Sequence, residues 1–322
     1  MTDWKSSMLE YFFSINSQNR DIIKGLEIKY QNMPPKLFKY CSFSDYKKKD
    51  LLNNTVHLSY PDNFNDPYDC SLTCSDSRSL IKQFFILNEL NYPFSKLSNE
   101  SKKKLIASDV TVEYNEMYDV IMRECFPAIP FGDPHANGIL DDYGSVFENV
   151  GKKISNGFKK SVVIACFSEI NDSMLMWSHY ADNHRAFCLE YDFKSLTNSK
   201  EIAKLLYPVI YQQEMFNITK YMLNFSANTD GFYKVRAAIT KSSEWSYEKE
   251  WRLILPTEHF PNVTSIKIPL PQKIYAGSKI TKENKYFLES FVENKNIPLY
   301  HGSMNEKMFR LEFKEQKGET FT

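Results

Sequence analysis

The segment that decides the fold runs from residue 166 to residue 192 and reads CFSEINDSMLMWSHYADNHRAFCLEYD. An apolar run at 162–167 leads into it, and alternating apolar residues at 186–191 close it. The flanks predict two strands, and the residues between them predict a helix over 173–182 with Asp172 or Ser173 as its cap. So many polar side chains between two core-forming strands predict a pocket wall and not a solvated loop.

The composition limits the class of protein. Forty Lys and Arg balance forty Asp and Glu, so no net field attracts nucleic acid or an anionic membrane. Cys70 and Cys74 have a zinc-like spacing but no second pair, so no metal is expected. Residues 1–30 lack a signal-peptide pattern, and no apolar run approaches the ~20 residues of a membrane span. We therefore expect a cytoplasmic protein with reduced thiols and a small-molecule or protein substrate.

The order of the predicted elements indicates an α+β fold. Residues 1–34 predict an N-terminal helical arm, and 35–322 predict a single α+β domain. Its helices are expected at 44–52, 173–182 and 282–293, and residues 77–160 are expected to form a helical insertion on one side of the sheet. A central mixed or antiparallel sheet is predicted from strands at 37–41, 55–60, 162–168, 186–192, 207–211, 250–255, 264–268 and 272–276, with short strands near 299 and 309–313.

Residues 64–69, FNDPYD, place an amide and two carboxylates around a proline. A simple Asx-turn, in which Asn65 and Asp66 bond to their own backbone, explains the motif. The functional alternative is a pocket wall, because Phe64 and Tyr68 would anchor the turn to the core and fix its polar groups.

The helix predicted inside 166–192 carries two candidate site residues, Trp177 and His179. Since two residues separate them, they do not share a helix face, and one of the two is expected to face the pocket. His179 and His184 lack the spacing of a helical zinc motif, although Glu190 follows on the next strand.

A third motif, WSYEKEWRLILP, occupies residues 245–256. On a strand, Glu248, Glu250 and Arg252 share one face, and Arg252 would offset the repulsion between the two carboxylates. A solvated sheet edge is the alternative. The flanking Trp245 and Trp251 and the apolar run that follows favour a cavity.

Together the three motifs resemble a bacterial family known as domain of unknown function 2971. The resemblance implies a fold but no activity. It rests on Lys39, Tyr40, 58–61, 64–69, 166–169, Asn171, Asp172, 176–181, 188–192, Lys241, Trp245, Tyr247, Glu248, 250–252 and Gly277.

A second resemblance is to ADP-ribosyltransferases of the Arg-Ser-Glu type. Ser59 matches their second position and Glu248-Lys249-Glu250 their third, whereas Lys39-Tyr40 stands where those enzymes have an Arg. The resemblance implies NAD as the substrate. Glu250 would stabilise the positive charge that develops on the ribose, and Glu248 would orient the acceptor. Ser59 and Tyr40 would position the dinucleotide.

The leading hypothesis is therefore an enzyme that transfers ADP-ribose or cleaves NAD, in a phage-defence or stress system. Further substrate contacts are expected from Asn65, Asp66, Trp177, His179, Glu190 and Arg252.

Two alternatives stay open. One is a hydrolase or nuclease, with or without a divalent metal, that uses Asp66, Asp69, Glu169, Glu190 and His179. The other is a non-catalytic ligand sensor or interaction module, in which Asn65, Asp66, Glu248 and Arg252 form a buried polar network.

Overall fold

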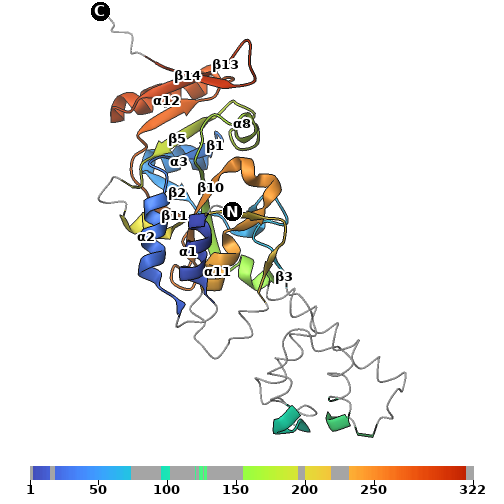
Figure 1. Ribbon diagram of the computed structural model, residues 1–322. Coiled ribbons are helices and arrows are strands. Elements are labelled where there is room, and N and C mark those ends of the chain that lie inside the picture. Colours follow the sequence, from blue (N-terminus) through green and yellow to red (C-terminus); the bar gives the residue numbers. More distant parts are fainter. Residues whose placement is uncertain are drawn as a thin grey trace, which may run out of the picture. The chain divides into compact units, whose positions relative to one another are not determined.

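The computed structural model describes residues 3–14, 19–73, 96–101, 120, 123–125, 127–128, 155–194, 200–218 and 232–316 (Figure 1). The chain divides into two compact units. Unit 1 comprises 1–70, 159–215 and 234–322, and unit 2 comprises 71–158 and 216–233. The helical insertion predicted at 77–160 lies mostly outside the described residues, and the predicted domain boundaries stay a prediction.

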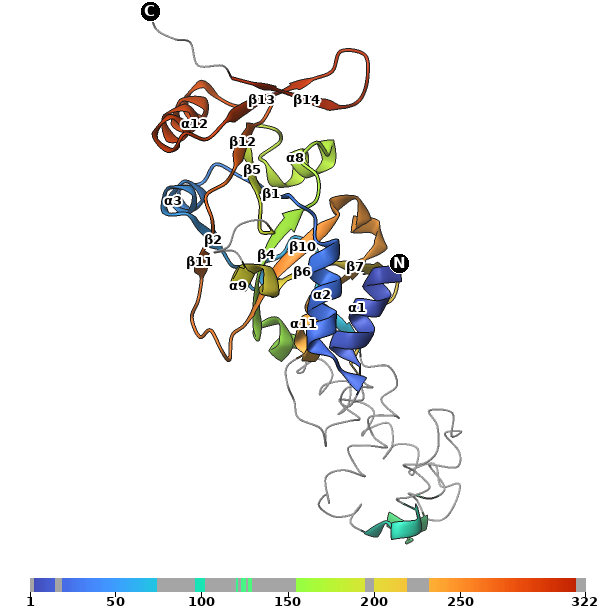
Figure 2. The same ribbon diagram turned by 60° about the vertical axis from the view of Figure 1, so that its left-hand side comes forward.

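Unit 1 is built on an eight-stranded sheet with the order β14-β13-β12-β5-β1-β4-β10-β6 (Figures 1 and 2). Neighbouring strands run antiparallel except for the parallel pair β12 and β13. The predicted α+β class with a mixed sheet is confirmed. The strands are β1 (Leu37–Cys41), β4 (Val162–Ser168), β5 (Phe187–Tyr191), β6 (Leu206–Pro208), β10 (Glu250–Pro256), β12 (Lys273–Ala276), β13 (Leu299–Met304) and β14 (Leu311–Glu315).

Short strand pairs accompany this sheet. In unit 1, β2 (Thr55–His57) pairs with β11 (Ser265–Lys267), and β7 (Ile210–Gln212) pairs with β9 (Thr240–Ser242). In unit 2, β3 (Leu72–Thr73) pairs with β8 (Phe216–Asn217).

Several helices begin at capping side chains that the sequence contains. Ser44 accepts a hydrogen bond from Lys47 N at the start of α3, Ser173 caps α8 and Thr281 caps α12. None of the helices in the described part of the chain is long and apolar enough to cross a bilayer. The α-helices are α1 (Asp3–Phe13), α2 (Ile22–Asn32), α3 (Asp45–Asn53), α8 (Met174–Tyr180), α9 (Lys200–Leu205), α11 (Phe232–Ala238) and α12 (Lys282–Lys295), and the 3-10 helices are η2 (Pro61–Asn63) and η5 (Ser243–Glu248).

Helices α1 and α2 lie side by side and pack on the β10 and β6 end of the sheet (Figure 2). Trp4 stacks on Trp251 of β10 with 6.3 Å between ring centroids, and Lys5 Nζ donates to the carbonyl of Val209 at 3.0 Å. The helical arm therefore covers the strand that carries Glu250 and Arg252.

The strand predicted at 250–255 is present as β10, but the expectation that Glu248 lies on the same strand is wrong. Residues Ser243–Glu248 form the 3-10 helix η5, and β10 begins only at Glu250. Lys249 between them adopts a left-handed conformation with φ of 45°. Glu248 and Glu250 therefore do not share a strand face, although alternation in the sequence indicated that they do. Similarly, the strand predicted over 207–211 is two strands, β6 and β7, which belong to different sheets.

The sheet splits between β1 and β4. The two strands pair at Phe38 and Ser168, and Lys39 then reaches across to the Cys166 carbonyl with its side chain at 3.0 Å. Further along β4, the backbone of Ser59 pairs with Ile164. The separation of β1 from β4 opens a space inside the sheet, between side chains that are far apart in the sequence.

Candidate functional site

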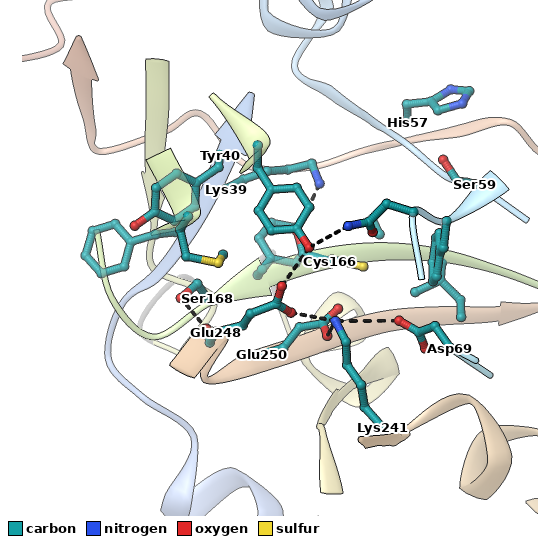
Figure 3. A pocket seen from close by; sticks show the side chains of 18 of the residues that line it. Lys39, Tyr40, His57, Ser59, Asp69, Cys166, Ser168, Lys241, Glu248 and Glu250 are labelled. Carbon is teal, nitrogen blue, oxygen red and sulfur yellow. Dashed lines mark hydrogen bonds and ion pairs between the residues drawn. The ribbon is translucent and has the colours of Figure 1, made fainter. Parts of the chain in front are cut away.

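A pocket with a volume of about 170 Å³ occupies this split in unit 1 (Figure 3). Six of the predicted site residues line it: Tyr40, Ser59, Asn65, Asp69, Glu248 and Glu250. They come from β1, from the segment after β2, from the 64–69 turn and from the junction of η5 with β10. The structure thus brings the motif at 64–69 and the motif at 245–256 together with Ser59.

Lys241, the middle residue of β9, joins the carboxylates at one end of the pocket (Figure 3). Its Nζ lies 2.5 Å from Glu248 Oε2, 3.1 Å from Glu250 Oε2 and 3.5 Å from Asp69 Oδ2. All four side chains are buried, although they line the pocket. Lys241 was quoted from the sequence only as part of the family resemblance, and its role as the common partner of three carboxylates was missed.

Arg252 lies behind this group and does not line the pocket. Its guanidinium binds Asp69 with two parallel hydrogen bonds of 2.8 and 2.6 Å and donates from Nε to Glu250 Oε1 at 2.9 Å. Its Nη1 also donates to the carbonyl of Ala238 at 2.7 Å. The side chain is fully buried and its donors are engaged, so Arg252 positions the carboxylates and has no free group for a substrate.

The two glutamates have pKa values that are shifted in opposite directions. Burial alone would raise the pKa of Glu250, but the positive charges of Arg252 and Lys241 lower it to about 2. Burial, and then the negative charge of Glu250, raise the pKa of Glu248 above its ordinary value. Although burial opposes it, the carboxylates led by Glu250 raise the pKa of Lys241, which is therefore an ammonium ion. At neutral pH the pair contains one strongly acidic and one weakly acidic carboxyl group.

The left-handed residue Lys249 makes this arrangement possible. It turns the chain between the two glutamates, so that both point toward Lys241 from different elements. The turn is held on both sides, because Ser168 Oγ donates to the Glu248 carbonyl at 2.6 Å and Glu250 N donates to Tyr211 Oη at 2.8 Å. A non-glycine residue in this conformation is strained, and such strain is common at functional sites.

Tyr180 of α8 links the three sequence motifs. Its hydroxyl donates to Glu248 Oε1 at 2.6 Å and accepts from Asn65 Nδ2 at 3.5 Å. Tyr180 was not among the predicted site residues. The sequence pattern that could have indicated Tyr180 is its i, i+4 spacing from Met176, which places the two residues on one helix face. Both of them line the pocket.

The expectation that Trp177 or His179 faces the pocket is wrong. Trp177 is fully buried, packs edge-on against Tyr40 and donates from Nε1 to the Asn171 carbonyl at 2.6 Å. His179 is exposed and lies beside Trp245, with 6.5 Å between ring centroids. Helix α8 turns the face with Met176 and Tyr180 toward the pocket instead.

Glu190 and Asp66 also lie away from the pocket lining. Glu190 is buried on β5, where Tyr275 Oη donates to it at 2.5 Å and Lys36 Nζ lies 3.0 Å away. Asp66 accepts from Tyr68 N at 2.8 Å, as in a simple Asx-turn. Of the predicted buried network, only Glu248 and Arg252 are buried in one group, which Asp69, Lys241 and Glu250 complete, whereas Asn65 is exposed and Asp66 lies outside the group.

The residues proposed for a metal-assisted hydrolase do not converge. Glu169 Oε1 accepts from Trp251 Nε1 at 2.8 Å, whereas Glu190 and His179 lie in the two other places described above. Among the described residues, no three His, Cys, Asp or Glu side chains are grouped so as to hold a metal ion.

The fold and site define an α+β protein with a pocket that is lined at one end by three buried carboxylates and a lysine, with Arg252 behind them. Residues 176–253 match the family model described as Protein of unknown function (DUF2971). This match confirms the first predicted resemblance, and the matched segment contains Tyr180, Lys241 and the two glutamates. No curated protein and no solved structure matched the chain. The likeness to ADP-ribosyltransferases stays a prediction.

Proposed function

We propose that the pocket is the active site of an enzyme that breaks the bond between nicotinamide and ribose in NAD. The observation that carries the proposal is the convergence of Ser59, Glu248 and Glu250, from distant segments, on one pocket. These are the positions that the resemblance to ADP-ribosyltransferases marks. A role in NAD consumption during phage defence or stress is part of this proposal.

The opposite pKa shifts support a division of labour between the glutamates. Glu250 is ionised at neutral pH, and a fixed negative charge stabilises the positive charge that builds on the ribose as the bond breaks. Glu248, whose pKa is raised, can accept a proton from the incoming hydroxyl or water. Pairs of titratable groups whose pKa values are pushed apart commonly divide acid and base roles in this way.

The proposed step balances in atoms and charge. The bond between ribose C1′ and the nicotinamide nitrogen breaks, and its electron pair leaves with nicotinamide, which becomes neutral. The acceptor oxygen bonds to C1′ and gives its proton to Glu248. Lys241 and Arg252 hold Glu250 in place during these changes.

The size of the pocket is compatible with part of a dinucleotide. Pockets for drug-sized ligands measure about 300–1,000 Å³, so a volume of about 170 Å³ holds a ring and its immediate neighbour but not all of NAD. The nicotinamide and ribose would enter, and the adenosine would stay outside.

The experiment is to incubate the full chain with NAD and measure released nicotinamide. We expect release by the unmodified protein and a loss of about 100-fold or more in Glu250→Gln, because electrostatic stabilisation is commonly worth this much. Glu248→Gln is the second variant, and Glu201→Gln, on the exposed face of α9, is the control. Far-UV and near-UV circular dichroism check that each variant is folded. If the unmodified protein releases no nicotinamide and NAD does not raise its melting temperature, the proposal fails.

A further inference from the structure

The pocket has a basic side, of which the proposed function uses only Ser59. Lys39, Lys47 and His57 line it, together with Ser59. Figure 3 shows His57 and Ser59 on one segment, away from the group of Glu248 and its partners. The pocket is thus acidic in one part and basic in another.

Lys39 has donors to spare. Its Nζ gives one hydrogen bond, to the Cys166 carbonyl at 3.0 Å, and an ammonium group has three N–H donors. Among the described residues, no carboxylate forms an ion pair with Lys39. Lys39 is half-buried, and a lysine whose charge is partly removed from water is stabilised by an anionic partner.

Lys47 shares its counter-ion with other groups. Its Nζ lies 3.7 Å from Asp50 Oδ2, and Asp50 Oδ1 already accepts from Thr55 Oγ1 at 2.9 Å. Burial lowers the pKa of Lys39, and the charge of Lys47 lowers it further. Burial, followed by Lys47, also lowers the pKa of His57. Burial is the main cause of both shifts, and the positive charge of Lys47 adds to each of them.

Ser59 adds a hydroxyl to the same place. Its backbone N and O pair with Ile164, which fixes the residue on the edge of β4. Within the described part of the chain, its Oγ makes no hydrogen bond, so it can donate to an anion. Two ammonium groups and a hydroxyl are a donor set that suits tetrahedral oxyanions.

We propose that Lys39, Lys47 and Ser59 form a binding site for a phosphate group, which restricts the ligands of the pocket to phosphorylated compounds. The site is consistent with the proposed function, because NAD carries two phosphates. Only the identity of the ligand as NAD rests on that function. Binding of phosphate itself requires the basic residues and no bond cleavage.

The test is isothermal titration of the full chain with inorganic phosphate, pyrophosphate and acetate at low ionic strength. We expect both phosphates to bind and acetate to bind at least tenfold more weakly. Lys39→Met and Lys47→Met should each weaken pyrophosphate binding about tenfold or more, since each removes a charge-assisted hydrogen bond. Lys49→Met is the matched control, because Lys49 is an exposed residue of α3, the helix that carries Lys47. This variant should bind pyrophosphate as tightly as the unmodified protein does.

Several results would overturn the phosphate site. They are the absence of phosphate and pyrophosphate binding, equal binding of acetate, or equal losses in Lys47→Met and Lys49→Met. Glu248→Gln separates this proposal from the proposed function. It should bind pyrophosphate as the unmodified protein does, whether or not the protein cleaves NAD.

Discussion

Arg252 holds the acidic part of the pocket together. With Lys241 it balances Asp69, Glu248 and Glu250, so removing its charge would leave three carboxylates around one ammonium ion. Taking one partner out of a buried ionic group typically costs about 3–5 kcal/mol, because an uncompensated charge stays buried.

We predict that Arg252→Met lowers the free energy of unfolding by about 3–5 kcal/mol, measured by urea denaturation at neutral pH. The matched control is Arg310→Met, which removes an exposed pair with Glu312 and should cost less than about 1 kcal/mol. Equal small losses in both variants would show that the buried group does not contribute to the fold.

Lys29 is a buried cation without a carboxylate among the described residues. Its Nζ donates to the Lys204 carbonyl at 2.7 Å and lies 4.1 Å from the centre of the Tyr207 ring. Burial lowers its pKa to about 7. Between this value and the ordinary lysine pKa of 10.5, the unfolded chain binds a proton that the folded chain does not, so raising the pH favours the folded state.

We therefore predict that Lys29→Met raises the free energy of unfolding at pH 7 by about 1–4 kcal/mol, as replacement of buried ions by apolar side chains often does. The gain should shrink as the pH rises from about 7 to about 10. Lys204→Met, at a half-exposed position, is the control. Denaturation at several pH values measures both effects, and a gain that does not depend on pH would contradict the assigned titration.

At the scale of elements, the turn between α8 and β5 packs against the end of β12. Gly277 N donates to the Ala186 carbonyl at 2.8 Å, and Lys279 N donates to the His184 carbonyl at 2.9 Å. A Cβ atom on Gly277 would lie 2.2 Å from the oxygen of His184, which belongs to the backbone and moves only with the turn. This contact explains why a glycine stands at the position that the family resemblance included.

Gly277→Ala should accordingly lower the free energy of unfolding by about 1–3 kcal/mol, because the turn must move away from β12. Gly157→Ala is the control. Gly157 lies in a helical segment, and a Cβ atom added there would have no heavy atom within 4 Å. That exchange should be neutral or stabilising by about 0.5–1 kcal/mol. Thermal denaturation of the two variants measures both effects. An unchanged melting temperature in Gly277→Ala would argue against the close packing of the turn on β12.

The sequence predicted the elements with strong local signals and missed those set by tertiary structure. Strands 37–41 and 162–168 match their predicted bounds, because apolar runs with clear ends have few alternatives. The junction at Lys249 was missed, since nothing in a lysine indicates a left-handed conformation. The choice of helix face in α8 was also wrong, because the sequence does not show which face the β1 and β4 split meets.

At the scale of the whole molecule, the pocket depends on contacts between residues far apart in the chain. Tyr180 of α8 and Lys241 of β9 reach the glutamates, and Asp69 of the 64–69 turn reaches Lys241. The sequence marked the three motifs and the importance of Glu248 and Glu250. It did not indicate Lys241 as their common partner, because pairing over such separations leaves no local pattern.

The central claim is that Glu248 and Glu250 act as an unequal pair in one active site. The most direct measurement is the rate of nicotinamide release from NAD between about pH 5 and pH 9 for the unmodified protein and Glu248→Gln. We predict that the rate of the unmodified protein falls as the pH drops through the raised pKa of Glu248, because the base becomes protonated. In Glu248→Gln the rate should be low and should lose this acidic limb. An acidic limb that persists in Glu248→Gln, or no release at any pH, would contradict the account.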